Sequence, residues 1–223
     1  MIRIYIICEG RTETMFVNEL LKEHFVHEGI DLIAKLIGRP GHQGGNIQFD
    51  RLYADLRKLL LGDSTAYCTT FFDFYGLHPD FPGKKNAQQK TVVSDKYMCI
   101  IDALTEKIKA ELGESSWYRF IPYVQMHEFE GLLFSDPDGL ARGIGQRDLA
   151  SDFRTIRNGF DSPEAINDSP HTAPSKRIEK LFSPYDKPRH GPLAALEIGL
   201  ETILAQCPLF NQWINHLKSL ASP

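Results

Sequence analysis

Acidic residues stand at the ends of apolar runs in this chain. Glu9 directly follows the run at residues 4–8, and Asp73 follows the run at residues 67–72. If both runs are strands of a parallel sheet, their carboxyl ends lie at the same edge, where open α/β sheets bind ligands. Carboxylates brought together there repel one another unless a cation neutralises them. The pattern therefore predicts a site with oxygen ligands for one or two divalent cations, Mg2+ or Mn2+.

A second acid follows Glu9 after four residues. Gly10 permits a tight turn after the first run, and Thr12 is a suitable cap for a helix that begins near Glu13. Glu13 would then lie in the first turn of that helix, close to the end of the strand, as a further metal ligand. The alternative is that Glu13 only favours the helix N-terminus electrostatically.

The run at residues 119–125 also leads into acids. Glu128 and Glu130 follow it, next to His127. Because residues two apart on a helix do not share a face, we expect at most one of the two glutamates to be a direct metal ligand. A single acid at a strand end is usually a cap or a solvated group, so coincidence is the alternative for the whole set.

Basic residues in the chain are candidates for contacts with a phosphate-bearing substrate. The glycine-rich loop at residues 38–46 could cradle a phosphate, although it matches neither the Walker A nor the GxGxxG pattern. Lys176 or Lys187 could stabilise charge that develops on phosphate. The alternatives are a flexible loop and solvated surface lysines. The candidates for substrate binding are Arg39, His42, Lys84, Lys85, His127, Lys187 and His190.

Strands and helices alternate in the first part of the chain. Apolar runs predict strands at residues 3–8, 30–36, 67–72 and 119–125. Helical spacing predicts helices at residues 12–25, 49–61 and 95–112, with a polar excursion at residues 76–93. Repeated βα units are typical of α/β proteins whose mainly parallel sheet is covered by helices.

The rest of the chain has a different character. It predicts helices at residues 128–134, 140–158, 175–182, 193–205 and 210–220, with a loop at residues 162–174. We therefore expect an α/β core over residues 1–135 and a helical C-terminal extension over residues 136–223 that packs on this core.

The composition is that of an ordinary globular protein. The 223 residues carry a net charge of -4, which argues against a polycationic nucleic-acid coat. Four scattered cysteines lack zinc-ligand spacing, so buried free thiols are expected. The N-terminal apolar run is too short for a signal peptide, and no stretch is long enough to cross a membrane. These features predict a cytoplasmic protein.

Five segments of the sequence resemble one known family. The segments are EGRTE, FFDFYGL followed by DFPG, MHEFEGLLFSD, SPEAINDSPHTAPSKRI and YDKPRHG. Together they resemble the domain-of-unknown-function family 4276, which is similar to TOPRIM-like proteins and to the nuclease domain of the overcoming-lysogenization-defect (OLD) proteins. The resemblance implies a TOPRIM-like, Rossmann-like α/β fold that uses acids and a divalent metal on nucleic acid. It also implies an ATPase partner of the AAA or ABC type, as in anti-phage loci.

The resemblance assigns roles to individual residues. Glu9 corresponds to the TOPRIM glutamate, Glu13 to the second acid of the OLD-type ExxxE pattern, and Asp73 to the first aspartate of the DxD pair. Tyr75 stands where that pair has its second aspartate. Lys176 corresponds to the basic residue near the scissile phosphate. Glu9, Asp73 and Lys176 are therefore the predicted catalytic residues.

The leading prediction is a metal-dependent nuclease that cleaves phosphodiester bonds in DNA or RNA. Tyr75 in place of an acid favours the alternative, a catalytically inactive binding or sensor module that works with an ATPase. A third hypothesis is hydrolysis of a small nucleotide, which the modest net charge permits. The sequence leaves the oligomeric state open, including a homo-oligomer.

Overall fold

A parallel sheet forms the centre of the protein in this computed structural model, which describes residues 1–38, 46–167 and 169–221. The strands are β1 (Ile2–Cys8), β2 (Ile30–Leu36), β3 (Tyr67–Asp73), β4 (Phe120–Ile121) and β5 (Val124–Gln125). Their order is β2-β1-β3-β4, and β5 also pairs with β3. Each of these pairings is parallel. The predicted mainly parallel sheet is thus confirmed, and the TOPRIM relation stays a prediction.

The strand predicted at residues 119–125 is divided in two. Pro122 lies between β4 and β5 and has no N–H group for the sheet ladder. The side chain of Thr70 on β3 fills this gap. Its hydroxyl accepts a hydrogen bond from Tyr123 N at 3.0 Å and donates one to Tyr123 O at 2.7 Å. The chain therefore stays attached to β3 until Gln125.

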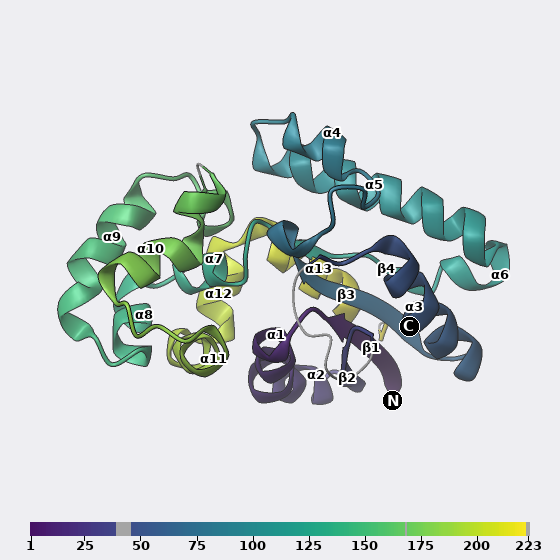
Figure 1. Cartoon of the computed structure of the whole chain (residues 1–223). Coiled ribbons are helices and arrows are strands. Elements are labelled where there is room, and N and C mark those ends of the chain that lie inside the picture. Colours follow the sequence, from purple (N-terminus) through teal and green to yellow (C-terminus); the bar gives the residue numbers. More distant parts are fainter. Residues whose placement is uncertain (39–45, 168, 222–223) are drawn as a thin grey trace.

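Helices lie on both sides of the sheet (Figure 1). The segments α1 (Arg11–Phe16) and α2 (Lys22–Val26) are joined by a π-helical segment (Val17–Leu21) and lie below the sheet in this view. Above it lie α4 (Lys84–Gln88), α5 (Val93–Leu112) and α6 (Glu114–Trp117). The connection between β2 and β3 contains α3 (Phe49–Gly62), and a 3-10 turn (Phe74–Gly76) follows β3. The polar excursion expected at residues 76–93 thus contains one short helix.

The C-terminal part of the chain is helical. Its helices are α7 (Glu130–Leu133), α8 (Pro137–Gly143), α9 (Ala150–Asn158), α10 (Pro174–Leu181), α11 (Lys187–Ile198), α12 (Leu200–Gln206) and α13 (Pro208–Ser219). Three 3-10 turns connect them at Arg147–Leu149, Pro163–Ala165 and Pro170–Thr172. Helices α8 to α11 gather on one side of the sheet, and α11 packs against both α1 and α8 (Figure 1). The division of the chain at residue 135 stays a prediction.

Two predicted long helices were wrong because glycines interrupt them. The helix expected at residues 140–158 is divided after α8, where Gly145 adopts a φ of 71°. The helix expected at residues 193–205 is divided between α11 and α12, where Gly199 adopts a φ of 81°. Such angles are readily available to glycine and end a right-handed helix. No helix among the described residues is long and apolar enough to span a membrane.

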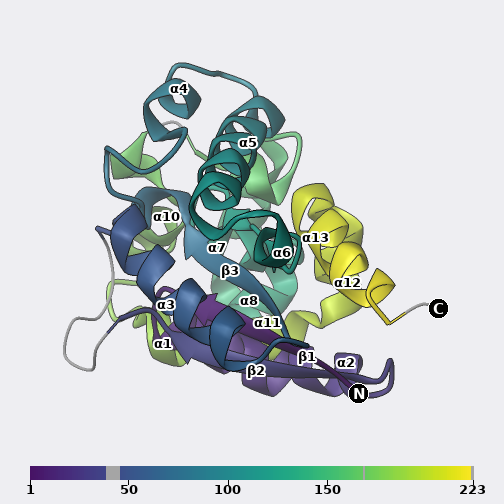
Figure 2. The ribbon, with the colours of Figure 1, turned by 90° about the vertical axis from the view of Figure 1, so that its right-hand side faces the viewer.

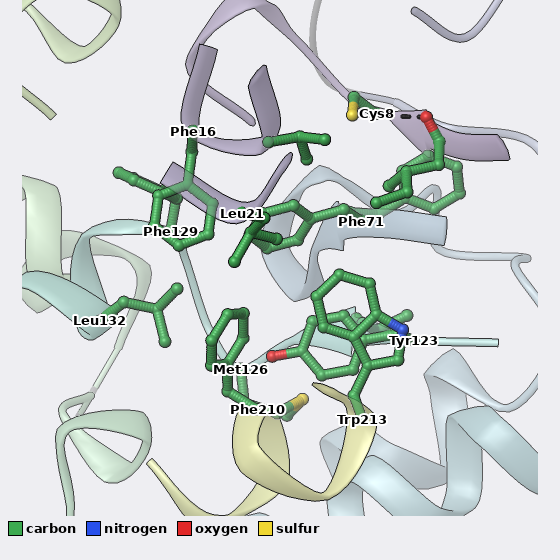
Figure 3. Close-up of a cluster of buried hydrophobic side chains, with 14 of the residues drawn as sticks. Cys8, Phe16, Leu21, Phe71, Tyr123, Met126, Phe129, Leu132, Phe210 and Trp213 are labelled. Carbon is green, nitrogen blue, oxygen red and sulfur yellow. Dashed lines mark hydrogen bonds between the residues drawn. The ribbon is translucent and has the colours of Figure 1, made fainter. Parts of the chain in front are cut away.

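An aromatic cluster joins α13, which lies beside α12 in Figure 2, to the sheet (Figure 3). Phe71 on β3 contacts Phe16 at 5.7 Å and Trp213 at 5.5 Å between ring centroids. Trp213 also stacks on Tyr123 at 4.3 Å and donates a hydrogen bond to Thr69 Oγ1 at 2.9 Å. This packing fixes the ends of β1, β3 and β5 relative to one another, and the acidic residues follow directly from those ends.

Candidate functional site

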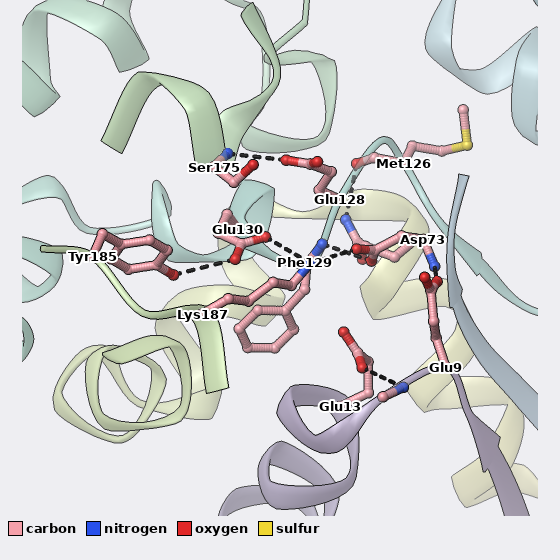
Figure 4. A network of polar contacts seen from close by, with 12 residues as sticks. Glu9, Glu13, Asp73, Met126, Glu128, Phe129, Glu130, Ser175, Tyr185 and Lys187 are labelled. Carbon is pink, nitrogen blue, oxygen red and sulfur yellow. Dashed lines mark hydrogen bonds and ion pairs between the residues drawn. The ribbon is translucent and has the colours of Figure 1, made fainter. Parts of the chain in front are cut away.

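The carboxyl ends of β1 and β3 bring two predicted acids together (Figure 4). These strands pair in register, with Cys8 opposite Phe71. Glu9 follows β1, Asp73 ends β3, and Glu9 Oε2 accepts a hydrogen bond from Asp73 N at 3.0 Å. A β-carbon at Gly76 would lie 2.2 Å from the Glu9 carboxylate, so any larger residue there would require the Glu9 side chain to move. The structure therefore places both acids at one sheet edge.

Glu13 lies in the first turn of α1 and points toward the same space (Figure 4). Its Oε2 accepts a hydrogen bond from Gly10 N at 2.9 Å, and the residue is 3% exposed. Burial, followed by the negative charge of Asp73, raises the pKa of Glu13 to about 8. A carboxyl in this position retains its proton at neutral pH unless a cation approaches.

Lys187 is the basic residue that meets these acids. Its Nζ lies 2.7 Å from Asp73 Oδ2 and 3.0 Å from Glu130 Oε2, while Asp73 Oδ1 accepts a hydrogen bond from Phe129 N at 2.8 Å. Burial alone would lower the pKa of Lys187, but the charges of Asp73, Glu130 and Glu13 raise it well above its ordinary value. Lys187 is therefore protonated at neutral pH and lies between two carboxyl groups.

Glu128 and Glu130 contact different neighbours. Glu130 is fully buried, its Oε1 accepts a hydrogen bond from the Tyr185 hydroxyl at 3.2 Å, and burial raises its pKa to about 7. Glu128 Oε2 instead accepts a hydrogen bond from Ser175 N at 3.0 Å, in the first turn of α10. Of the two, Glu130 is the one that shares Lys187 with Asp73.

Lys84 is a second buried lysine near Glu9. It is 4% exposed, and its ammonium group donates a hydrogen bond to Phe74 O and lies 3.3 Å from the centre of the Phe74 ring. Burial lowers the pKa of Lys84 to about 7, although the charge of Glu9 opposes this change. Lys85, by contrast, is exposed and forms an ion pair with Asp80 at 2.7 Å.

The side chain of His127 is buried. The residue is 3% exposed, and neither ring nitrogen has a hydrogen-bond partner among the described residues. Its ring lies 5.7 Å from the rings of both Phe74 and Tyr75. Burial, followed by the charges of Lys96 and Lys84, lowers the pKa of His127 to about 3. It is therefore a neutral imidazole with unmet hydrogen-bonding capacity.

The other predicted residues lie outside this network. Lys176 forms a surface ion pair with Glu179 at 2.7 Å, and its side chain is 52% exposed. His190 Nδ1 accepts a hydrogen bond from Asp186 N at 2.8 Å. The hydroxyl of Tyr75, at the second DxD position, donates a hydrogen bond to Asn167 Oδ1 at 2.5 Å. Arg39 and His42 lie outside the described residues.

A cavity of about 230 Å³ opens next to the acids. It is lined by Glu9, Gly10, Arg11, Thr12, Glu13, Lys187 and Pro188. Arg11 was absent from the predicted site, although it lies inside the EGRTE segment between two predicted metal ligands. The cavity thus combines carboxylates with two cationic side chains, a combination that suits a metal-bound or phosphate-bearing ligand.

For a metal ion, the types of ligand in the site and the arrangement of those ligands lead to different conclusions. Carboxylate oxygens are the ligands that Mg2+ and Mn2+ prefer. No group of three or more His, Cys, Asp or Glu residues within the described ranges has the geometry of a metal site. Figure 4 shows the Lys187 ammonium between the carboxylates of Asp73 and Glu130.

Fold and site together define a class of protein, a parallel α/β protein with a buried acid–lysine cluster at the carboxyl ends of its strands. The family model described as Domain of unknown function (DUF4276) matches residues 8–218, so the chain belongs to this family. This match confirms the resemblance carried by the five segments. No curated protein and no solved structure matches the chain.

Proposed function

We propose that this protein hydrolyses phosphodiester bonds of DNA or RNA with the help of Mg2+ or Mn2+. The observation that carries the proposal is the convergence of Glu9, Glu13 and Asp73 beside a cavity that Lys187 also lines. Acids at the carboxyl ends of adjacent parallel strands are placed where α/β proteins bind their ligands. A half-buried lysine beside them supplies a positive charge that water screens only in part.

The acids and the lysine of the site have different roles in this proposal. Glu9, Glu13 and Asp73 would hold the metal ion, with Glu130 as a fourth oxygen donor. A metal ion held by these residues would lower the pKa of a water molecule and neutralise charge on the phosphate. Lys187 stays protonated because of its acidic neighbours and can stabilise negative charge on a phosphate in the cavity.

The partner proposals follow from the family resemblance. Nucleic acid is the proposed substrate, and a local site of this kind is compatible with a net charge of -4. An ATPase partner and a cytoplasmic location belong to the same proposal. The proposal does not include Lys176 as a catalytic residue, because Lys187 is the lysine that contacts Asp73.

Cleavage of labelled DNA and RNA by the purified protein tests the proposal. Mg2+ and Mn2+ are added separately, with a chelator as the metal-free control. We expect metal-dependent cleavage that Glu9→Gln and Asp73→Asn reduce by about 100-fold or more, the scale of removing one electrostatic group from an active site. Glu179→Gln, a surface acid paired with Lys176, is the matched control and should cleave like the wild type.

A binding or sensor module is the second candidate function. It is favoured by the contacts of Lys187, which already forms ion pairs with Asp73 and Glu130, and by the hydrogen bond that Tyr75 makes with Asn167. Fluorescence anisotropy with labelled oligonucleotides distinguishes the two functions. Binding that Lys187→Met weakens, without cleavage under any metal condition, would support the sensor and contradict the nuclease.

A further inference from the structure

The strand β2 lies at one edge of the sheet. It pairs with β1 on one side, and no strand among the described residues pairs with it on the other. An edge of this kind offers unpaired backbone N–H and C=O groups to a further strand. Leu36, at the end of β2, is 40% exposed, although it is a large apolar residue. The free edge of β2 is therefore a candidate surface for pairing with another chain.

The hydrogen bonds to β1 show which backbone groups of β2 face the free edge. Ile2 N donates to Gly29 O at 2.9 Å, and Ile37 N donates to Cys8 O at 3.0 Å. Because backbone groups alternate in direction along a strand, the odd-numbered residues of β2 direct theirs toward β1. The N–H and C=O groups that point to the free edge are therefore those of the even-numbered residues, Ile30, Leu32, Ala34 and Leu36.

Two charged side chains are spaced so that β2 complements itself. Asp31 and Lys35 lie on the same face of the strand, on either side of Ile33. If a second copy of β2 pairs antiparallel with Ile33 opposite Ile33, Asp31 of each copy lies opposite Lys35 of the other. This register also places Leu32 opposite Ala34, and both direct their backbone groups to the free edge, as hydrogen-bonded pairs must. The opposite charges then occupy pairs without backbone hydrogen bonds, where side chains approach most closely.

We propose that this protein forms a two-fold symmetric dimer in which the β2 strands of two copies pair antiparallel, with Asp31 opposite Lys35. The sheets of the two copies join into one sheet through this contact. Leu36 of each copy lies opposite Ile30 of the other, so the exposed leucine gains an apolar neighbour. The same patch serves on both copies, as two-fold symmetry requires. The inference goes beyond the proposed function, whose acids and lysine all belong to one copy.

The charges favour a second copy over an unrelated strand. Charged side chains on an edge strand discourage pairing with other strands, which leave those charges without partners. An antiparallel copy supplies a partner for both charges at once. Within one copy, Lys22 Nζ lies 3.5 Å from Asp31 Oδ1, and both side chains are partly exposed. A surface ion pair of this kind contributes little to stability, so Asp31 can exchange it for Lys35 of the second copy.

Sedimentation velocity of the purified protein over a wide range of concentrations tests the dimer. We expect the wild type to dimerise reversibly. Asp31→Lys places lysine opposite lysine at both symmetric positions and should weaken the dimer by about tenfold or more. Lys35→Asp places aspartate opposite aspartate and should have a similar effect. The double variant with both substitutions restores opposite charges and should dimerise like the wild type.

Ala34→Pro tests the strand pairing independently of charge. The N–H group of Ala34 points to the free edge, so proline removes a hydrogen bond of the dimer and none of the ladder with β1. We expect this variant to be a folded monomer with the far-ultraviolet circular dichroism of the wild type. Lys218→Glu is the matched control, because Lys218 forms an ion pair with Glu28 at 3.5 Å, the same distance as between Lys22 and Asp31. It should dimerise like the wild type.

The outcomes are distinct. Weaker dimers in both single charge variants, with recovery in the double variant, support the inference. A wild type that stays monomeric at every concentration overturns it and leaves the β2 edge to a strand of another protein. A dimer that the charge reversals leave unchanged also overturns it, because the contact then lies elsewhere. Neither negative result affects the proposed nuclease, whose test is cleavage by the acids and lysine of one copy.

Discussion

Glu13 should make the folded protein less stable as the pH rises. The residue is 3% exposed, and burial followed by the charge of Asp73 raises its pKa from 4.5 to about 8. The folded state therefore holds this proton more tightly than the unfolded chain does. The stabilisation that results is fully present below about pH 4.5 and is lost as the pH rises through about 8.

The size of the effect follows from the same two values. At about 1.36 kcal/mol for each pKa unit, the change from 4.5 to about 8 corresponds to at most about 5 kcal/mol. Local relaxation and entry of water reduce the cost of ionising a buried acid. We therefore expect about 2–4 kcal/mol of pH-dependent stability from Glu13.

Urea unfolding of Glu13→Gln between pH 5 and pH 9, in the presence of a chelator, measures this contribution. Glutamine cannot ionise, and its side-chain oxygen can still accept the hydrogen bond from Gly10 N. The free energy of unfolding of the variant, relative to the wild type, should increase by about 2–4 kcal/mol from pH 5 to pH 9. Glu19→Gln, an exposed acid further along the same helical segment, is the control. A difference that stays constant over this pH range would refute the reasoning.

Two further predictions concern other buried polar groups. Glu164 accepts hydrogen bonds from Leu209 N at 3.0 Å and Phe210 N at 2.8 Å. In urea unfolding, Glu164→Ala should therefore lower the free energy of unfolding by about 2–4 kcal/mol, and Glu164→Gln should lower it by less. His127→Phe removes two buried nitrogens without partners among the described residues and should raise the free energy of unfolding by about 1 kcal/mol. A loss of nuclease activity in this more stable variant would assign His127 a role in the reaction, and a loss of stability would contradict the packing argument.

The parts of the fold that depend on local pattern could be predicted from the sequence. The strand at Ile30–Leu36 has the predicted bounds, because an apolar run between polar residues indicates a strand directly. The approach of Glu9 to Asp73 also follows from the sequence, because parallel pairing of β1 and β3 brings their ends together. The helix breaks could not be read from hydrophobic spacing, which continues through Gly145 and Gly199. Their positive φ angles depend on how the next helix packs.

The contact between Lys187 and Asp73 could not be predicted from the sequence for a different reason. The two residues are 114 positions apart, and their contact depends on the packing of α11 against α1. In the sequence, Lys176 and Lys187 were both candidates to stabilise charge that develops on phosphate. Only the tertiary arrangement places one between two carboxylates and the other on the surface beside Glu179.

The C-terminal helices complete the site that the sheet begins. Ser175 N contacts Glu128, the Tyr185 hydroxyl contacts Glu130, and Lys187 contacts both Glu130 and Asp73. Each of these partners comes from α10, α11 or the segment between them, whereas Asp73 ends β3 and the two glutamates follow β5. Because a buried carboxylate without a partner is strongly destabilising, the charge state of the cluster and the position of α11 depend on each other.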